Sequence, residues 1–171
     1  MIRIVIADDH LILREGLRQV CLDAQDIEIV GEAADAAETL ARVQGGAFDL
    51  LLLDLSMPGN SGLELVRRVR ELAPALPILI LSMHEPEHYA VRVIRAGARG
   101  YLSKDSSGLQ LLDAIRKVAS GRPCISDEIA EQFVLDAMPA VSDYPHKQLS
   151  AREFEVFNRL IAGATPTEVK K

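Results

Sequence analysis

Acidic side chains follow two aliphatic segments of the chain, at the points where those segments end. Asp8 and Asp9 come directly after the run at residues 2–7, and Asp54 closes the run at residues 48–53. Carboxylates crowded into one pocket repel one another, so they take up protons or share a cation. Mg²⁺ prefers a few oxygen ligands and retains some of its waters. If the fold brings these three acids together, they are candidate magnesium ligands, and Asp54 is a candidate nucleophile toward phosphorus.

Two later aliphatic segments also lead into polar side chains. One ends at Ser82, and the next passes through Tyr101 before it reaches Lys104. An ammonium group stabilises charge on the oxygens of a transferring phosphoryl group, which is the role we expect for Lys104. Ser82 would donate a hydrogen bond to the resulting acyl phosphate. Movement of its loop would bias Tyr101 between an outward and an inward rotamer, so the pair would act as a switch.

The spacing of apolar residues predicts the elements that position these groups. Over residues 1–120, short aliphatic runs alternate with stretches of helical period. This is the pattern of a parallel sheet covered by helices on both faces. Five strand–helix units are predicted, with strands at residues 2–7, 27–32, 48–53, 77–82 and 98–102.

Four helical stripes are predicted to lie on this sheet, because apolar residues recur in them every three or four positions. Their members are Leu13, Leu17, Val20 and Cys21, then Ala36, Leu40 and Val43, then Leu65, Val66, Val69 and Leu72, then Leu109, Leu112, Ile115 and Val118. The last of these helices is expected to begin near Ser106 and Ser107 and to end at Gly121.

The carboxyl ends of the strands form the ligand-binding edge of a doubly wound sheet. Five side chains should therefore converge there, namely those of Asp8, Asp9, Asp54, Ser82 and Lys104. Each has an ordinary interpretation by itself, because an Asp after a strand commonly caps the next helix and Ser or Lys is common at the surface. A lone tyrosine likewise packs more often than it gates. The joint placement of these residues at strand ends favours a functional site.

Beyond the sheet, residues 126–137 are predicted to form a further helix, and the two prolines that follow indicate a linker. A capping box at residues 150–153 then opens another helix, and residues 165–168 begin a second one. The predicted organisation is a domain at 1–120, a helical extension and linker at 121–148, and the start of an all-helical domain at 149–171. A helix begun at residue 165 cannot be completed by residue 171, so we expect the natural protein to continue.

Composition limits the classes of protein to which the chain can belong. With 171 residues and 49% apolar content, it can bury a core. A net charge of −6 argues against a general coat for nucleic acids. The longest apolar run is far shorter than a membrane span, and the N-terminus lacks a signal region, so we expect a cytoplasmic protein with no membrane partner.

The cysteines and histidines carry no predicted chemistry. Cys21 and Cys124 are isolated from each other and from any histidine cluster, so we assign them no redox role. The four histidines, at positions 10, 84, 88 and 146, are dispersed along the chain. They are expected to be surface residues and to form no zinc site.

Several of these motifs together resemble the receiver domain of bacterial two-component response regulators. They are Asp8-Asp9, Asp54 with Met57-Pro58-Gly59 and Gly62, Ser82, and the run from Gly100 to Asp105. The likeness covers residues 1–120. It implies a flavodoxin-like fold, a doubly wound parallel sheet of five strand–helix units. It also implies phosphorylation of Asp54 by a sensor histidine kinase.

The resemblance implies a metal site and a set of residues that tune the phosphorylated state. Asp8, Asp9 and Asp54 would hold Mg²⁺ together with the backbone carbonyl of Ser56. Ser56 and His84 match positions that tune dephosphorylation in the family.

The remaining residues of the edge also match receiver positions. Lys104 would pair with the phosphoryl group, and Ser82 and Tyr101 would be the switch pair.

The opening Asp8-Asp9-His10, the run from Gly100 to Asp105 and the segment from Leu149 to Gly163 look like the NarL/FixJ subfamily. Its output is a LuxR-type helix-turn-helix domain, whose recognition helix lies in the major groove. That helix would follow residue 171, so the chain as written is not expected to bind DNA specifically. Promoter DNA would be a partner only of the full-length output domain. A homodimer is plausible through the first and fifth helices, or through the fourth helix and fifth strand.

Three other functions stay open at this point. The chain could be a phosphorylation-controlled interaction module that does not bind DNA. A Mg²⁺-dependent phosphatase with an aspartyl nucleophile would need a second Asp where Ser56 stands, to protonate the leaving group. A flavin-binding electron carrier would need a phosphate loop where the chain has Asp8-Asp9-His10, which would repel phosphate. We therefore expect a signalling protein, not an enzyme.

Overall fold

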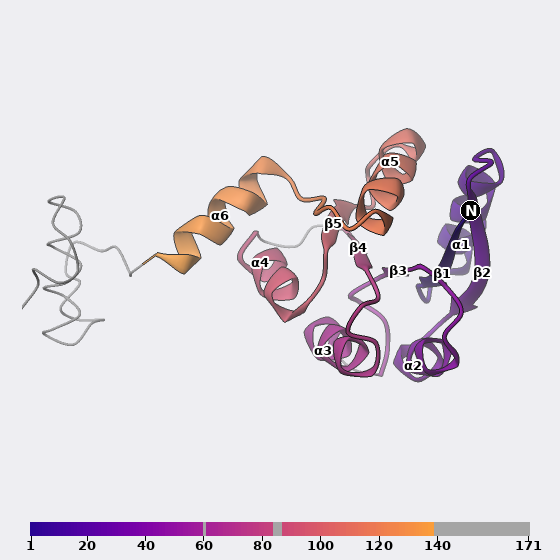
Figure 1. Ribbon diagram of the computed structural model, residues 1–171, viewed down its shortest axis with the longest axis horizontal. Coiled ribbons are helices and arrows are strands. Elements are labelled where there is room, and N and C mark those ends of the chain that lie inside the picture. Colours follow the sequence, from indigo (N-terminus) through magenta and orange to yellow (C-terminus); the bar gives the residue numbers. More distant parts are fainter. Residues whose placement is uncertain (60, 84–86, 139–171) are drawn as a thin grey trace, which may run out of the picture. The chain divides into compact units, whose positions relative to one another are not determined.

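The computed structural model describes residues 1–59, 61–83 and 87–138. Within these residues it contains one sheet of parallel strands in the order β2-β1-β3-β4-β5 (Figure 1). The strands are β1 (Ile2–Ala7), β2 (Ile27–Ala33), β3 (Leu50–Leu53), β4 (Ile78–Ser82) and β5 (Gly100–Ser103). This confirms the predicted flavodoxin-like, doubly wound architecture.

Helices connect the strands and continue after the last one. They are α1 (Leu11–Leu22), α2 (Ala36–Gly45), α3 (Gly62–Leu72), α4 (Glu87–Ala96), α5 (Gly108–Ala119) and α6 (Asp127–Ala137). The chain divides into two compact units, Met1–Ala130 and Glu131–Lys171, and the sheet with α1–α5 belongs to the first. The prediction of a helix at residues 126–137 is confirmed by α6. The predicted linker and second domain fall from residue 139 onward, outside the described residues.

Two apolar clusters hold the helices on opposite faces of the sheet. One cluster joins the sheet to α2, α3 and α4, and the other joins it to α1 and α5. Successive residues of β1 alternate between them: Val5 and Ala7 enter the first cluster, and Ile4 and Ile6 enter the second. A strand buried on both faces needs apolar side chains at every position, which explains the uninterrupted aliphatic runs.

Most of the predicted stripe residues lie in these clusters, but two do not. Leu72 and Leu109 are exposed, at 46% and 76%. Successive helical residues turn by about 100°, so Leu109 points far around α5 from Leu111, which is buried instead. The i to i+3 spacing from Leu109 to Leu112 therefore misled the prediction at the start of α5. Leu72 is the last residue of α3, where the helix leaves the sheet.

Local signals place the helix ends that lead toward the site. Ser107 caps α5 with a complete capping box, accepting from the Gln110 amide at 3.2 Å while the Gln110 side chain accepts from the Ser107 amide at 2.8 Å. This agrees with the start predicted near Ser106 and Ser107. After Ser120, the last turn is closed by Gly121 at φ +92°, a conformation that favours glycine.

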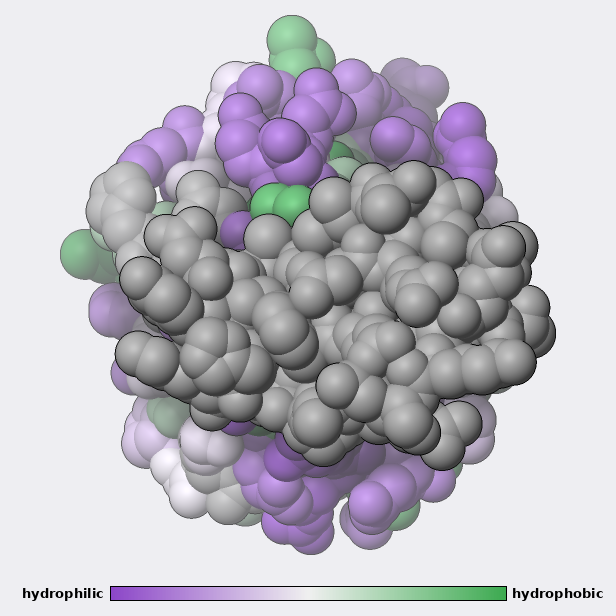
Figure 2. Space-filling view, turned by 90° about the vertical axis from the view of Figure 1, so that its left-hand side faces the viewer, coloured by the Kyte–Doolittle hydropathy of each residue, from purple (hydrophilic) through white to green (hydrophobic). Residues whose placement is uncertain are grey.

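Some large apolar side chains of the described part are exposed, among them Ile12 at 88% and Leu109 at 76%. The part of the face visible in Figure 2 is mainly hydrophilic, and its hydrophobic residues occur in separate places. None of the helices in the described ranges has the length and apolarity needed to cross a membrane. Cys21 is buried and Cys124 is half-buried, and both are free thiols.

One ion pair joins α5 to the turn before β2. Arg116 Nε and Nη2 donate to the two carboxylate oxygens of Asp26 at 2.7 and 2.9 Å. This hydrogen bonding by Arg116 holds the pKa of the Asp26 carboxyl below its ordinary value. The bidentate geometry links segments that are 90 residues apart in the sequence.

We expect this pair to contribute to stability in a pH-dependent manner. Because the pKa of Asp26 is lowered by folding, the contribution is present above the ordinary carboxyl pKa of about 4. It is lost as the pH falls through the lower pKa of the folded state. Melting temperatures measured across the acid range should therefore fall more steeply for the wild type than for Arg116→Met. Arg67→Met, which removes a looser i,i+3 pair with Glu64 at 3.9 Å, is the matched control and should follow the wild type. Parallel acid profiles for wild type and Arg116→Met would refute the expectation.

Candidate functional site

The strand order brings two buried acids to one edge of the sheet. β1 and β3 are hydrogen-bonded neighbours with Ala7 opposite Leu53, so Asp8 and Asp54 both follow the ends of adjacent strands. The Asp54 amide donates to the Ala7 carbonyl at 2.9 Å, which continues the pairing to the site itself. Asp8 is 2% exposed and Asp54 is 3% exposed. Buried carboxylates of this kind require compensating partners.

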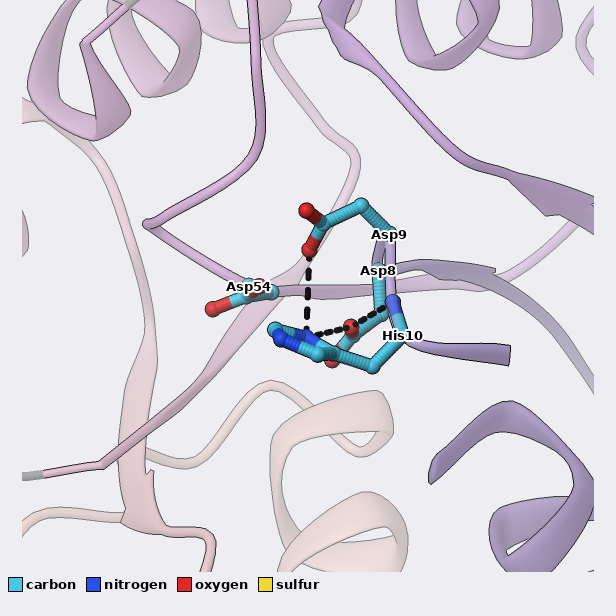
Figure 3. A group of neighbouring side chains, drawn as sticks. All are labelled: Asp8, Asp9, His10 and Asp54. Atoms are coloured by element: carbon cyan, nitrogen blue, oxygen red, sulfur yellow. Dashed lines mark hydrogen bonds and ion pairs between the residues drawn. The ribbon is translucent and has the colours of Figure 1, made fainter. Parts of the chain in front are cut away.

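Four residues at this edge form a cluster of potential metal ligands. Asp8, Asp9, His10 and Asp54 each offer a ligand atom within 4.8 Å of the others. Figure 3 shows the first three at the end of β1, with Asp54 arriving from the end of β3. Asp9 is the more accessible acid, with 33% of its side chain exposed. The acidic pocket, as we call Asp8, Asp9 and Asp54 together, is thus assembled as the sequence predicted.

Lys104 supplies the ammonium group that the sequence placed here. Its Nζ lies 3.1 Å from Asp8 Oδ2 and 3.3 Å from Asp54 Oδ1, and its side chain is only 6% exposed. The position follows from the pairing of β4 with β5, because the Lys104 amide donates to the Ser82 carbonyl at 2.7 Å. One ammonium group is therefore shared between two buried carboxylates.

Ser56 contacts Asp54 through its side chain as well as its backbone. The Ser56 hydroxyl lies 3.0 and 3.1 Å from the two carboxylate oxygens of Asp54, and the Ser56 amide donates to Oδ1 at 3.2 Å. The sequence prediction concerned the Ser56 carbonyl as a metal ligand and a role in dephosphorylation, and it did not include these bonds. A serine two residues after an Asp is a local signal for such bonds, since short polar side chains often bond within a turn.

The two predicted switch residues lie next to the pocket on β4 and β5. Ser82, the last residue of β4, is 3% exposed and pairs with Ser103 of β5. Tyr101 is half-buried against the cluster on the α2, α3 and α4 face, with its hydroxyl shielded from solvent. His84, the second residue predicted to tune dephosphorylation, lies outside the described residues.

Sequence reasoning missed the participation of His10. Its side chain is 61% exposed, in line with the expected surface position, yet Nδ1 lies 3.0 Å from Asp8 Oδ1 and 3.1 Å from Asp9 Oδ1 (Figure 3). The His10 amide also donates to Asp8 Oδ1 at 2.8 Å. The available signal was its place directly after two acids, where the turn into α1 folds the ring back over them.

The charges of the pocket fit a divalent cation. Three carboxylates face the single ammonium group of Lys104, so the described site carries a negative surplus. Asp8 Oδ2 is buried and, although it pairs with Lys104, it accepts no hydrogen bond within the part of the chain described. Hard oxygen ligands with one accessible member suit Mg²⁺, which keeps several waters when it binds.

The comparisons with known proteins agree with this geometry. A family model described as the response regulator receiver domain matches residues 4–116. The response regulator UvrY of Escherichia coli is 33% identical over 172 residues, covering 100% of this chain and 79% of that protein. The oxygen regulatory protein NreC of Staphylococcus epidermidis is 38% identical, covering 94% of this chain and 78% of that protein.

A solved structure shares both fold and sequence. The crystal structure of a LuxR-family two-component response regulator from an Aurantimonas species superposes with a TM-score of 0.71. It is 36% identical and covers 78% of this chain and 96% of that one. The family match at residues 4–116 spans the five strands from Ile4 onward and the edge on which the acidic pocket lies.

Replacing Lys104 by Met should destabilise the fold strongly. The substitution leaves two buried carboxylates without their shared cation, so we expect the free energy of unfolding to fall by about 3 kcal/mol. Adding Asp54→Asn to that variant should recover part of the loss, because one of the two like charges is removed. Urea unfolding without divalent cations measures both effects.

The matched control is Lys117→Met on the exposed surface of α5. It should change stability by no more than about 0.5 kcal/mol. Equal losses for Lys104→Met and Lys117→Met would show that the buried ammonium group is not what balances Asp8 and Asp54.

Proposed function

Because the chain belongs to the response regulator receiver family, in its NarL/FixJ type, we propose that it is a phosphorylation-controlled switch of a two-component system. Asp54 accepts a phosphoryl group from a sensor histidine kinase, and Mg²⁺ is required. The observation that carries the proposal is the shared ammonium group of Lys104, 3.3 Å from Asp54 and 3.1 Å from Asp8. A cation held beside a buried carboxylate suits the transfer of an anionic group to that carboxylate.

In the proposed reaction, a carboxylate oxygen of Asp54 forms a bond to phosphorus while the bond from phosphorus to the kinase histidine nitrogen breaks. The Ser56 hydroxyl contacts both oxygens of Asp54 in the described conformation, so it must release one of them first. Lys104 then shifts its contact from the carboxylate toward the phosphoryl oxygens. Bound Mg²⁺ would neutralise charge on those oxygens.

Asp8, Asp9 and Asp54 would hold the metal, together with the backbone carbonyl of Ser56. Support for this set comes from the clustering of the three carboxylates within 4.8 Å, at the end of a sheet where two of them are buried. Because the acids repel one another, a divalent cation stabilises the ionised form that Asp54 needs as a nucleophile.

The phosphoryl group would be sensed by Ser82 and Tyr101. Ser82 lies at the end of β4, and the Lys104 amide already bonds to its carbonyl at 2.7 Å. A hydrogen bond from the Ser82 hydroxyl to the phosphoryl group would draw the end of β4 toward Asp54 and change the space available to the Tyr101 ring. Ser56 and His84 are proposed to tune the lifetime of the acyl phosphate.

The output we propose is a LuxR-type helix-turn-helix domain that acts on promoter DNA in the full-length protein and pairs as a homodimer. The support is the sequence likeness at residues 149–163, which lie outside the described residues. The alternative is an interaction module that is controlled by phosphorylation without binding DNA. Against the phosphatase, Ser56 replaces the acid that would protonate a leaving group, and the relatives compared above are regulators.

Phosphorylation by a small-molecule donor tests the proposal directly. The chain incubated with acetyl phosphate and Mg²⁺ should gain one phosphoryl group in its intact mass, stable in acid and labile in base. The adduct should require Mg²⁺ and should be absent from Asp54→Asn. Asp49→Asn, at the opposite end of the same strand, is the matched control and should be modified like the wild type. A folded wild type that binds Mg²⁺ and gains no adduct would overturn the phosphorylation switch.

The switch is tested by substituting its hydroxyl. Ser82→Ala should still be phosphorylated on Asp54, because Ser82 makes no bond to phosphorus. The resonance of fluorotyrosine at position 101, assigned with Tyr101→Phe, should shift on phosphorylation of the wild type and shift much less in Ser82→Ala. A shift in Ser82→Ala as large as that of the wild type would show that the response of Tyr101 does not depend on the Ser82 hydroxyl.

A further inference from the structure

Arg14 of α1 joins the end of β2 to the turn that carries the acidic pocket. Its Nε lies 3.1 Å from Glu32 Oε1, and its Nη1 donates to the backbone carbonyl of Asp8. The two side chains are mostly buried, with 15% of Arg14 and 21% of Glu32 exposed. The guanidinium group thus contacts a carboxylate on one element and a backbone oxygen on another.

The Asp8 carbonyl depends on this donor because β1 ends at Ala7. The Asp8 amide continues the pairing with β2 by donating to the Ala33 carbonyl at 2.9 Å. Its carbonyl belongs to the peptide unit that leads into Asp9. A peptide unit is planar, so a hydrogen bond to its oxygen sets the direction in which the chain continues. Arg14 therefore influences where the Asp9 carboxylate points, although it does not touch that carboxylate.

Glu32 has two effects on Arg14. It fixes the orientation of a rigid planar fork, so that the donor aimed at Asp8 has one direction. It also balances a positive charge that would otherwise repel a cation in the neighbouring pocket. Arg14 can thus orient the Asp8 carbonyl through its hydrogen bond, while Glu32 compensates its charge.

We propose that Arg14, held by Glu32, is a positioning residue that orients the Asp8–Asp9 peptide so that both carboxylates face one divalent cation. The inference rests on the proposed function and deepens it, because it names a residue outside the ligand set on which the metal affinity depends. It predicts the direction in which Mg²⁺ affinity changes when Arg14 is replaced. Loss of a positive charge alone would strengthen binding of Mg²⁺, whereas loss of the positioning bond weakens it.

The test is the affinity of the full chain for Mg²⁺, measured by isothermal titration calorimetry without a phosphodonor. Arg14→Met keeps an unbranched apolar stem and removes the guanidinium fork. We expect its affinity to be about tenfold weaker, the scale seen when partners that orient metal ligands are removed. Arg18→Met is the matched control, since Arg18 also pairs with Glu32 but lies on the exposed side of α1. It should bind Mg²⁺ like the wild type.

A purely structural role predicts a different pattern. It would lower the melting temperature of Arg14→Met and leave the affinity of the folded protein unchanged below that temperature. In phosphorylation by acetyl phosphate, positioning predicts a higher half-saturating Mg²⁺ concentration with an unchanged rate at saturation. Affinity equal to or tighter than that of the wild type in folded Arg14→Met overturns the inference.

Arg14→Lys keeps the test decisive if the Met variant does not fold. A lysine retains the charge but cannot reproduce both bonds of the fork, so its Mg²⁺ affinity should also be weaker. Wild-type affinity in Arg14→Lys overturns positioning by the fork. Failure of the proposed function looks different, because a wild type that binds Mg²⁺ and gains no phosphoryl adduct overturns the switch while the affinity comparison still tests positioning. A folded wild type that binds no Mg²⁺ would overturn both proposals.

Discussion

Repulsion among carboxylates at the end of a buried sheet is the constraint around which the rest of this structure is arranged. Asp8 and Asp54 follow neighbouring strands and are almost fully buried, so their charges cannot be screened by solvent. Lys104 relieves part of the repulsion, but it arrives from β5, with β4 between it and β3. β5 and β3 are two strand spacings of about 4.8 Å apart, so the long side chain of Lys104 reaches across the end of β4, where Ser82 stands, to contact Asp54. The strand order, the serine at the end of β4 and Lys104 therefore together relieve the repulsion between Asp8 and Asp54.

The same arrangement links the pocket to the end of the first unit. Tyr101 follows Gly100 in β5, and its amide donates to the Cys124 carbonyl at 2.8 Å. Cys124 lies just before α6, whose first turn is capped by Ser126 and carries the buried Ile129. If β5 moves at Tyr101, then Cys124 must move with it or this hydrogen bond must break. A hydrogen bond therefore couples β5 to the segment before α6.

The fold could be predicted from the sequence because a strand buried on both faces needs apolar residues at every position. Few other structural elements give such short, uninterrupted aliphatic runs. Convergence of the acids with Lys104 followed from the topology, since carboxyl ends of parallel strands share an edge. Side-chain direction was harder. Leu109 has the spacing of a buried residue, but its place early in α5 turns it to solvent at 76% exposure. His10 and the hydroxyl of Ser56 reach the site through turn geometry, which one-dimensional spacing does not encode.

The charge balance of the pocket also explains why a phosphoryl group could act as a signal there. An acyl phosphate carries more negative charge than the carboxylate it replaces, roughly −2 in place of −1 at neutral pH. The pocket already holds more negative than positive charge, so each added charge increases the attraction for Lys104 and for a divalent cation. Arg14 makes its contacts with Glu32 and with the backbone carbonyl of Asp8, so it does not supply charge to Asp54. Groups free to rearrange, above all the Ser82 hydroxyl and the Lys104 ammonium, must therefore move toward the new oxygens. Because few positive groups lie near Asp54, its phosphorylation would draw Ser82 and Lys104 toward it. The ends of β4 and β5, which carry these two residues, would then be displaced.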